Sequence, residues 1–462
     1  MPGSYLDPSK DSCAGAQMRL FPVAMRRSHV LLAGAVVIGG IGALRASHAD
    51  EAAARIDGVE LARETSTFEG LAAPPPAAPV AEPTPPPPPV TGLGLADQLD
   101  LDHITRAGDH FEAPLKDGRR AILTLDPELQ ELAEHLLDEA KAPRGAIVAM
   151  APDGRVLAIA GRRTEKPKGG SDGTFDWHLA TDVWAPAASV FKLVTASALV
   201  GAGVDPDAKV CFHGGIRSVM ESNLVDDKHD SQCESLAFGV AHSNNAILGK
   251  LAYQHLEPEG LAAMAGTFGL DKALGDVPGM AGAIAIPKLK DLDFAKSAAG
   301  FTTPAGGAQL TAVGGALLAA TFADGGEQPA ARIVESIVGG GEVPQPGAHR
   351  VIAGDVAKAV ARMMGLTCDI GSAAKSFGKH RSLRVAGKTG TLTRTEPFYM
   401  EHSWFVGFAP AEKPQIVVSV VLGNPENWHL RGQEAARRMI DRALAVPSEK
   451  GLKDRSSKRR RS

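Results

Sequence analysis

The stretch PAASVFKLV, residues 186–194, places a serine and a lysine three positions apart at the start of an apolar helical pattern. Residues i and i+3 of a helix lie on one face, so the side chains of Ser189 and Lys192 can touch. A serine hydroxyl becomes a useful nucleophile when a nearby base takes its proton, and a lysine can be that base once burial or positive charge lowers its pKa. The pattern recurs at 372–375 and 376–379, so it identifies no site by itself.

A second stretch, HSNN at residues 242–245, begins another apolar helical pattern. Here Ser243 can relay a proton, and the amide of Asn245 can both donate and accept hydrogen bonds. A helix N-cap by Ser243 or Asn244 would explain the same residues without any catalytic role. This stretch too is ambiguous when taken alone.

A third stretch, VAGKTGT at residues 385–391, has the composition of a strand that lines a cleft. Its lysine and threonines, Lys388, Thr389 and Thr391, would offer a charge and two hydroxyls to a carboxylate. Gly390 would let a substrate backbone approach closely. An ordinary strand with a solvated lysine is the alternative. A phosphate-binding P-loop is excluded, because that motif needs a glycine five positions before its Gly-Lys pair and this chain has serine there.

Strand patterns near both ends of the chain enclose a middle part, from about 189 to 325, that is rich in alanine and leucine and reads as mostly helical. Asp126 and Pro127 are typical of a helix start. Strands near both ends with helices between them predict one antiparallel sheet built from both ends and covered by helices. The predicted strands are 146–150, 156–160, 385–391, 404–408 and 416–422, and a closing helix is predicted over 434–445.

Together the three stretches resemble the signatures of penicillin-binding proteins and serine β-lactamases, which are Ser-x-x-Lys, Ser-x-Asn and Lys-Thr-Gly. They occur in the family's order, with Ser189 before Ser243 and Ser243 before Lys388. The order excludes the two other Ser-x-x-Lys patterns, because both follow the Ser-x-Asn stretch. Further transpeptidase-like sequence includes Pro186, Thr302 to Pro304, Ala308-Gln309-Leu310 and Trp404-Phe405-Val406-Gly407. One departure is Ala188, which stands where the family often has glycine and is expected to narrow the approach to the nucleophile.

The resemblance implies an α/β (α+β) fold: an antiparallel sheet flanked by helices plus an all-helical lobe, with the site in the cleft between them. It also implies a role for each residue of the three signatures. The catalytic residues would be Ser189, Lys192 and Ser243, and the substrate-binding residues would be Asn245, Lys388, Thr389, Gly390 and Thr391.

The reaction implied by the resemblance is D,D-transpeptidation of peptidoglycan. Ser189 would attack the D-alanyl-D-alanine bond of a stem peptide, with the backbone N–H groups of Ser189 and Thr391 as the oxyanion hole. An amine of a second stem peptide would then take the acyl group, and β-lactams would be trapped on Ser189. No cofactor is expected, and the four separated cysteines, which include no Cys-x-x-Cys, give no support for a zinc site. Cys211 and Cys233 form either a disulfide or two half-buried thiols.

Several alternatives stay open at this level. A D,D-carboxypeptidase or a β-lactamase would use water in place of the amine, and a penicillin-binding sensor or scaffold on the same fold would not catalyse at all. A Ser-His-Asp hydrolase has little support, because its Gly-x-Ser-x-Gly pattern, at residues 169–173, lies in a polar loop without the strand that a nucleophile elbow needs. The net charge of −4 and the aromatic content of 5% argue against nucleic acid as a partner.

Composition divides the chain into four segments. A basic pair and a short apolar run predict a signal peptide or signal anchor over 1–49, which would place the protein in the cell envelope, at the periplasmic face of the inner membrane. A proline-rich linker is expected over 50–115, a transpeptidase domain over 116–447 and a basic disordered tail over 448–462. With no segment that resembles a glycosyltransferase, glycan polymerisation is expected to come from a separate partner.

Overall fold

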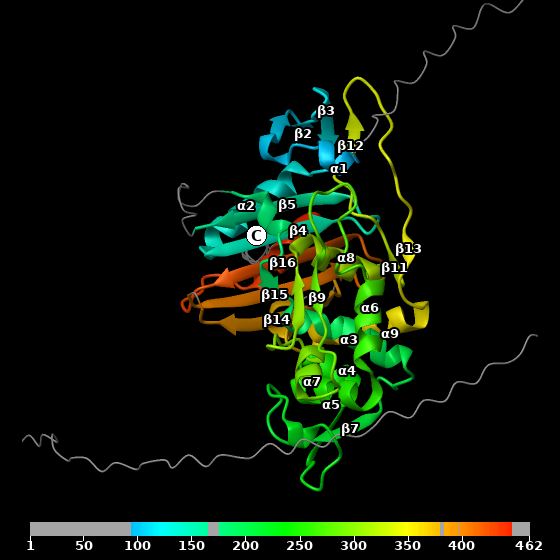
Figure 1. Ribbon diagram of the computed structural model, residues 1–462. Helices are drawn as coiled ribbons and strands as arrows, with labels where there is room; N and C mark the ends of the chain where they lie inside the picture. The colour runs from blue at the N-terminus through cyan, green and yellow to red at the C-terminus, as the bar shows by residue number, and fades with distance from the viewer. Residues whose placement is uncertain (1–93, 165–174, 379–382, 397, 446–462) are drawn as a thin grey trace, which may run out of the picture. The chain divides into compact units, whose positions relative to one another are not determined.

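The computed structural model describes residues 94–164, 175–378, 383–396 and 398–445 (Figure 1). The expected signal segment, the proline-rich stretch and the basic tail lie outside these residues, as does the Gly-x-Ser-x-Gly pattern. Within the described residues, no helix has both the length and the apolar character needed to cross a bilayer.

Five antiparallel strands form the central sheet in the order β14-β15-β16-β4-β5. The pairing of β16 with β4 joins strands from the two ends of the described chain, and it places Val420 opposite Ile147. The predicted hairpin and the three late strands are therefore confirmed, in one sheet. The strands are β4 (Arg144–Met150), β5 (Val156–Arg163), β14 (Ala386–Arg394), β15 (Met400–Ala409) and β16 (Ile416–Asn424).

Both faces of this sheet are covered by helices. Side chains alternate along a strand, so Val148 belongs to one apolar core and its neighbour Ile147 to the other. Helix α8 (Ala312–Ala323) packs into the first core, and because it is apolar all round, its residues from 312 to 322 are buried. Helices α2 (Pro127–Ala140) and α11 (Gly432–Ala443) pack into the second core. The layered antiparallel sheet predicted from the sequence is confirmed.

Helix α2 begins as its sequence predicts. The Asp126 carboxylate accepts a hydrogen bond from the backbone N–H of Leu129 at 2.9 Å, and Pro127 takes the first helical position, where its missing N–H costs nothing.

Most of the remaining helices form a lobe below the sheet in Figure 1, and the segment that carries Ser189 leads into it. That segment runs from strand β6 (Ala185–Pro186) through the short 3₁₀ helix η3 (Ala188–Phe191) into α3. The helices are α3 (Lys192–Gly201), α4 (Leu236–Ala241), α5 (Asn245–His255), α6 (Pro258–Thr267), α7 (Leu292–Ala298), α9 (Gly354–Asp369) and α10 (Ala374–Phe377).

Short strands that the sequence did not predict lie within and on either side of the middle part of the chain. Two- to four-residue strands make too weak a pattern to be distinguished from loops in sequence. Their sheets are β6-β10-β9, β7-β8 and β11-β13, built from β7 (Lys209–Phe212), β8 (Gln232–Ser235), β9 (Gly282–Ala285), β10 (Gly307–Leu310), β11 (Glu327–Gln328) and β13 (His349–Arg350).

The predicted boundary between linker and domain, at residue 115, is wrong, because the folded domain already includes residues 94–115. Residues 94–115 fold into part of a small sheet, β1-β2-β3-β12, at the top of Figure 1. Leu99 and Leu115 are buried in the apolar core, which a solvated linker would not allow. The sequence signal was weak because β1 and β2 have only three and five residues, and such short strands are hard to distinguish from loops. The elements are α1 (Leu95–Gln98), β1 (Thr105–Ala107), β2 (His110–Pro114), β3 (Arg120–Leu123) and β12 (Val334–Ile337).

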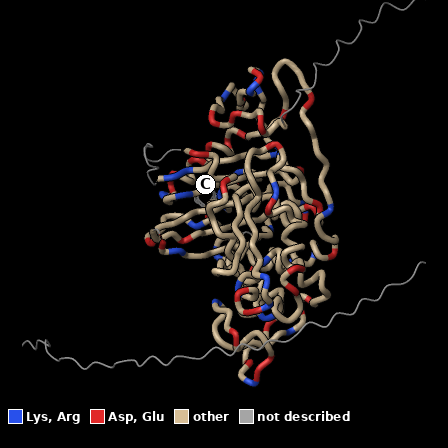
Figure 2. Tube along the Cα trace, in the orientation of Figure 1, with Lys and Arg blue, Asp and Glu red and all other residues tan. Residues whose placement is uncertain are grey.

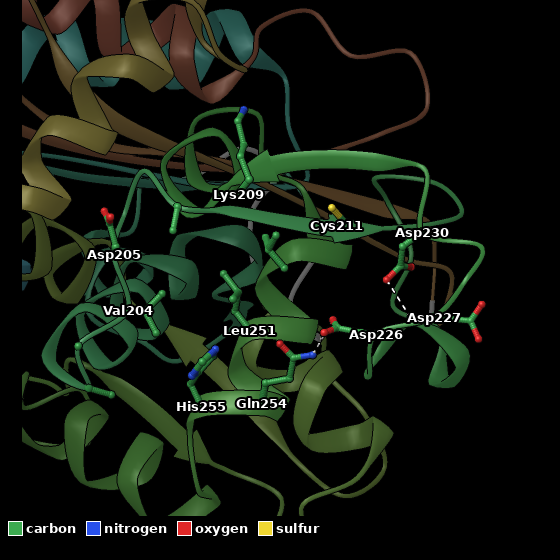
Figure 3. A pocket seen from close by; sticks show the side chains of 14 residues that line it. Val204, Asp205, Lys209, Cys211, Asp226, Asp227, Asp230, Leu251, Gln254 and His255 are labelled. Carbon is green, nitrogen blue, oxygen red and sulfur yellow. Dashed lines mark hydrogen bonds between the residues drawn. The ribbon is translucent and has the colours of Figure 1, made fainter.

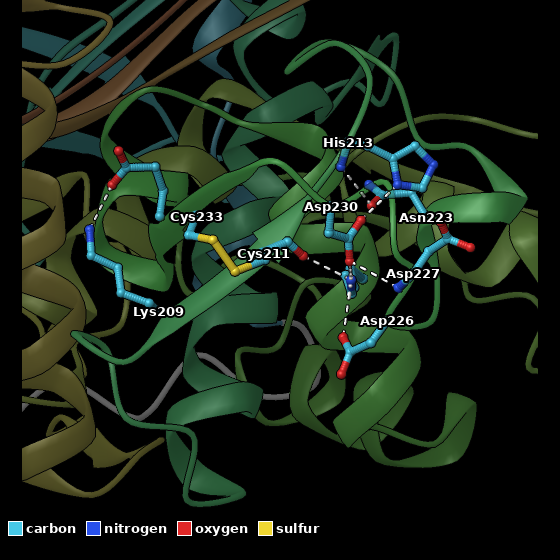
Figure 4. Close-up of a disulfide and its surroundings, with 10 residues drawn as sticks. Lys209, Cys211, His213, Asn223, Asp226, Asp227, Asp230 and Cys233 are labelled. Atoms are coloured by element: carbon cyan, nitrogen blue, oxygen red, sulfur yellow. Dashed lines mark hydrogen bonds and ion pairs between the residues drawn. A yellow bond between two sulfur atoms is a disulfide. The ribbon is translucent and has the colours of Figure 1, made fainter.

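A disulfide joins Cys211 of β7 to Cys233 of β8, which face each other in register (Figure 4). It closes the loop that leads from one strand to the other. Of the two alternatives that the sequence left open, the structure contains the disulfide. Cys368 is buried with a free thiol.

Charged residues of both signs are interspersed along the described chain (Figure 2). No groups of histidine, cysteine and carboxylate side chains suited to a metal ion occur among the described residues.

Candidate active site

The first part of the site is the Ser189–Lys192 pair. Ser189 lies in η3 and Lys192 begins α3, so the turn between them is a 3₁₀ turn, in which residues i and i+3 eclipse. The Lys192 Nζ lies 2.6 Å from the Ser189 Oγ. The structure therefore brings together the nucleophile and base that the sequence predicts.

The backbone around Ser189 is tightly constrained. Ala188 has φ 49°, in the left-handed region that favours glycine. Gly300 packs against it so closely that a Cβ at position 300 would lie 2.2 Å from the Ala188 carbonyl oxygen. The position before Ser189 therefore has a backbone conformation that glycine adopts more easily than alanine. The expected narrowing of the approach by Ala188 stays a prediction.

Lys192 has no exposed surface. Besides Ser189, its Nζ donates to the Asn245 Oδ1 and to the Ala299 carbonyl oxygen, each at 2.6 Å. Burial among neutral partners disfavours the charged form, and the charge of Lys388 adds to this, so the pKa of Lys192 is lowered well below that of an ordinary lysine. A neutral amine has a free lone pair, and Lys192 can then accept the proton of Ser189.

The second part of the site is the turn between α4 and α5. The side chain of Asn244 caps α5 by accepting from the N–H of Ile247, so the capping role and the site role fall on different residues. Ser243 has φ 58°, and this left-handed turn directs its hydroxyl to the Nζ of Lys388, 3.0 Å away. Asn245 points its amide oxygen at Lys192.

Asn245 is itself held by the loop between β7 and β8. Its Nδ2 donates to the Arg217 carbonyl oxygen at 2.6 Å, and its backbone N–H donates to the Ile216 carbonyl oxygen at 2.7 Å. Sequence reasoning could not find these partners or the Ala299 carbonyl, because a backbone carbonyl has no signature in the sequence.

The third part is strand β14. Lys388 is completely buried, and its Nζ donates to the Ser243 Oγ and to the Thr389 carbonyl oxygen, the latter at 2.9 Å. Burial lowers the pKa of Lys388 to about 7. The hydroxyl of Thr389 meets that of Ser372 at 2.6 Å, and Thr391 is exposed. The three signatures therefore come together in one place. Lys388 of the Lys-Thr-Gly strand contacts Ser243 of the Ser-x-Asn turn, and its charge lowers the pKa of Lys192 in the Ser-x-x-Lys stretch.

Packing inside the protein favours a glycine at position 390, in addition to the close approach of a substrate that the sequence suggests. A Cβ there would lie 3.1 Å from the Trp404 Cβ and 3.2 Å from the Val190 Cγ2, so the missing side chain makes room for η3 and β15. Trp404 in turn donates from its Nε1 to the Pro186 carbonyl oxygen at 2.9 Å. The glycine therefore lets the strand pack directly on the segment that carries Ser189.

The serines of the two other Ser-x-x-Lys patterns, Ser372 and Ser376, lie in different environments. Ser372 is bonded to Thr389 and so borders the site, whereas Ser376 lies buried in α10. The lysine that follows Ser376, at position 379, lies outside the described residues.

Two of the cavities are relevant to the site. One of about 400 Å³ is lined by β9, β10 and the 302–307 turn, and β10 pairs with the Pro186 strand directly before the nucleophile. The other, about 650 Å³, lies beneath the β7–β8 hairpin, and none of the residues that line it belongs to the three signatures (Figure 3). The residues that line it include four aspartates, Asp205, Asp226, Asp227 and Asp230, and one lysine, Lys209.

A family model described as penicillin binding protein transpeptidase domain matches residues 145–444. The chain belongs to this family. The resemblance inferred from the three signatures is confirmed, as is the fold class.

Named relatives agree with the transpeptidase family. Penicillin-binding protein PbpB of Mycobacterium tuberculosis is 27% identical over 339 residues, which cover 67% of this chain and 48% of that protein. The chain thus spans about half the length of this relative. Peptidoglycan D,D-transpeptidase PbpA of Mycolicibacterium smegmatis is 24% identical over 362 residues, covering 69% of this chain and 70% of that one.

Solved structures share the transpeptidase fold. The D,D-transpeptidase domain of a peptidoglycan glycosyltransferase from Eggerthella lenta matches with a TM-score of 0.57 and 25% identity, covering 71% of this chain and 84% of that one. Penicillin-binding protein 2B from Streptococcus pneumoniae matches with a TM-score of 0.58 and 22% identity, covering 72% and 61%. Penicillin-binding protein A from M. tuberculosis, solved as an imipenem acyl-enzyme complex, matches with a TM-score of 0.56 and 21% identity, covering 71% and 80%.

Proposed function

We propose that the protein is a serine D,D-transpeptidase that crosslinks peptidoglycan stem peptides through an acyl-enzyme on Ser189. The observation that carries the proposal is the contact of 2.6 Å between the Ser189 Oγ and the Nζ of a lysine with no exposed surface and a lowered pKa. A shifted pKa of this kind is what a general base needs at neutral pH.

Acylation begins when neutral Lys192 takes the Ser189 proton and the Oγ attacks the carbonyl carbon of the penultimate D-alanine. The backbone N–H groups of Ser189 and Thr391 receive the negative oxygen of the tetrahedral intermediate. When the C–N bond breaks, Ser243 gives the departing amine its proton and regains one from protonated Lys192, so the proton taken from Ser189 ends on the leaving D-alanine. Lys388, which donates to Ser243, stays charged and orients that hydroxyl. Overall, the serine exchanges its proton for the acyl group, and the leaving D-alanine gains a proton.

Substrate binding is assigned to the other signature residues. Lys388 supplies positive charge for the terminal carboxylate, and Thr389 and Thr391 supply hydroxyl donors. The Asn245 amide holds the substrate amide beside Lys192. The Gly390 backbone completes the strand along which the peptide lies.

The candidate activities differ in the acyl acceptor, which is an amine for a transpeptidase and water for a D,D-carboxypeptidase or a β-lactamase. We favour an amine over water, because the relatives named above include peptidoglycan D,D-transpeptidases. The hydrogen-bond partners described for Lys192 are all neutral, and none is a carboxylate that could activate a deacylating water. D,D-carboxypeptidase, β-lactamase and a non-catalytic sensor or scaffold are the outcomes against which the proposal is tested.

The setting follows from the substrate. Stem peptides lie in the cell envelope, so we propose export by the 1–49 segment, either cleaved or retained as a membrane anchor, and action at the periplasmic face of the inner membrane. A separate glycosyltransferase would supply the glycan strands. β-Lactams are expected to acylate Ser189 as substrate mimics.

The test uses the full-length chain with a fluorescent penicillin, followed by gel and intact-mass analysis. Wild type and Ser376→Ala, the matched control from the rejected pattern, should be labelled, and Ser189→Ala should not. Labelling that survives Ser189→Ala would sink the assignment of the nucleophile. An adduct that hydrolyses within seconds would favour a β-lactamase. Supplying a stem peptide with a free amine and detecting the crosslinked product separates transpeptidation from hydrolysis.

A further inference from the structure

Ser372 connects two parts of the site that are far apart in the chain. Its backbone N–H donates to the Ala241 carbonyl oxygen at 2.9 Å, two residues before Ser243. Its hydroxyl lies 2.6 Å from the hydroxyl of Thr389. The preceding Gly371 makes this approach feasible, because a Cβ there would lie 2.1 Å from the Ala241 carbonyl oxygen. Ser372 is therefore fixed at the junction of the helical lobe and β14.

The direction of the Ser372–Thr389 hydrogen bond matters for substrate binding. A hydroxyl has one hydrogen to donate, and a carboxylate can only accept. If Thr389 donates to Ser372, it has no hydrogen left for the substrate. If Ser372 donates to Thr389, the hydrogen of Thr389 is free to point at a carboxylate, and the two bonds polarise each other in the same direction.

We propose that Ser372 is a positioning residue for substrate binding. By donating to the Thr389 hydroxyl, Ser372 orients it so that Thr389 donates to the carboxylate of the donor peptide. The inference rests on the proposed function, because it takes Thr389 as a carboxylate ligand. It adds a residue outside the three signatures. The order of the signatures excludes Ser372 as the nucleophile, and this proposal gives its hydroxyl a role in substrate binding instead.

The solvent exposure of Ser372 makes the substitution experiment clean. Ser372 is exposed, whereas Thr389 is 9% exposed, so Ser372→Ala removes a hydroxyl without opening a cavity in the core. Ser372→Thr keeps the hydroxyl. The substrates are a penicillin and its methyl ester, which differ in the carboxylate that the pair is proposed to recognise. The rate of acylation of the full-length chain is followed by intact mass, and thermal unfolding is measured beside it.

The expected result is a lower carboxylate-to-ester ratio of acylation rates in Ser372→Ala, by about 3- to 10-fold, the range for one hydrogen bond. Ser372→Thr should restore the ratio. In a Thr389→Val background, Ser372→Ala should change the ratio by less than about twofold, because the residue through which it acts is gone.

Several results would overturn the inference, and the first two concern the role of Ser372 directly. One is an equal loss of rate with both substrates, which would mark Ser372 as merely structural. The other is an undiminished effect in the Thr389→Val background, which would mean that Ser372 acts without Thr389. A wild-type chain that is not acylated at all overturns the proposed function together with this inference, whereas an acylated wild type with an unchanged Ser372→Ala ratio overturns this inference alone.

Discussion

Lys192 and Lys388 are both fully buried, yet the proposed mechanism needs them in opposite charge states. Lys192 must be neutral to accept a proton, and Lys388 must be charged to attract a carboxylate. Burial lowers both pKa values, and the charge on Lys388 is a second cause of the shift at Lys192. Neighbouring groups with separated titrations are a common arrangement in acid–base sites.

The charge on Lys388 predicts how acylation depends on pH. Its pKa of about 7 means that it is charged below that pH and neutral above it. The second-order rate constant for a carboxylate-bearing penicillin should therefore fall as pH rises through about 7, by up to about tenfold per pH unit. The methyl ester should lack this alkaline fall, because it has no charge for Lys388 to attract. Stopped-flow acylation between pH 5 and 9 checks this, and an identical fall for both substrates would contradict it.

At the level of elements, the loop between β7 and β8 fixes the position of Asn245. The loop supplies the carbonyl oxygens of Ile216 and Arg217 that hold Asn245, and the Cys211–Cys233 disulfide closes it (Figure 4). Beneath the hairpin, the buried Lys250 donates to the Cys211 carbonyl oxygen at 2.8 Å and forms an ion pair with Asp230 at 2.6 Å. Covalent closure and this ion pair both hold the loop in place.

Removing the disulfide should therefore affect both stability and acylation. The Cys211→Ser, Cys233→Ser double variant is expected to lose about 3 kcal/mol of unfolding free energy, the value for closing a loop of about this length. Its acylation should also slow severalfold below the melting temperature, because Asn245 is held less firmly against Lys192. Denaturant unfolding and penicillin labelling measure the two effects. Added reductant should reproduce them in wild type and change nothing in the double variant; unimpaired acylation in the reduced protein would refute the coupling.

At the scale of the whole molecule, the domain extends further towards the N-terminus than its composition indicates. Residues 94–115 contribute buried Leu99, Leu101 and Leu115 to the apolar core and supply β1 and β2 of the small sheet. Burying three leucines corresponds to a stabilisation on the order of 5 kcal/mol.

A fragment that starts at residue 116 should consequently be much less stable than one that starts at residue 94, with both ending at residue 445. Loss of the buried leucines and of the β2–β3 pairing leaves apolar surface on the core exposed. Thermal unfolding and limited proteolysis compare the two fragments. Equal melting temperatures would show that the 94–115 segment adds nothing to the stability of the domain.

The long elements could be predicted from the sequence, because their signals are local. The hairpin before residue 163, the strands after residue 385 and the Asp126 cap each follow from periodicity and propensity over a few neighbours. The short strands and the 94–115 segment could not, because elements of two to five residues leave too weak a local pattern. The pairing of β3 with β12 also joins residues far apart in the chain.

For the site, the sequence alone determined which residue types were available and in what order, and that order selected Ser189 over Ser372. Only the tertiary structure decided their chemistry. The partners that bury Lys192 stand 53 and 107 positions away from it, and Ser372 meets Thr389 across 17 positions. A pKa or the direction of a hydroxyl depends on desolvation and on neighbouring charges and donors, and these exist only once distant segments have packed together.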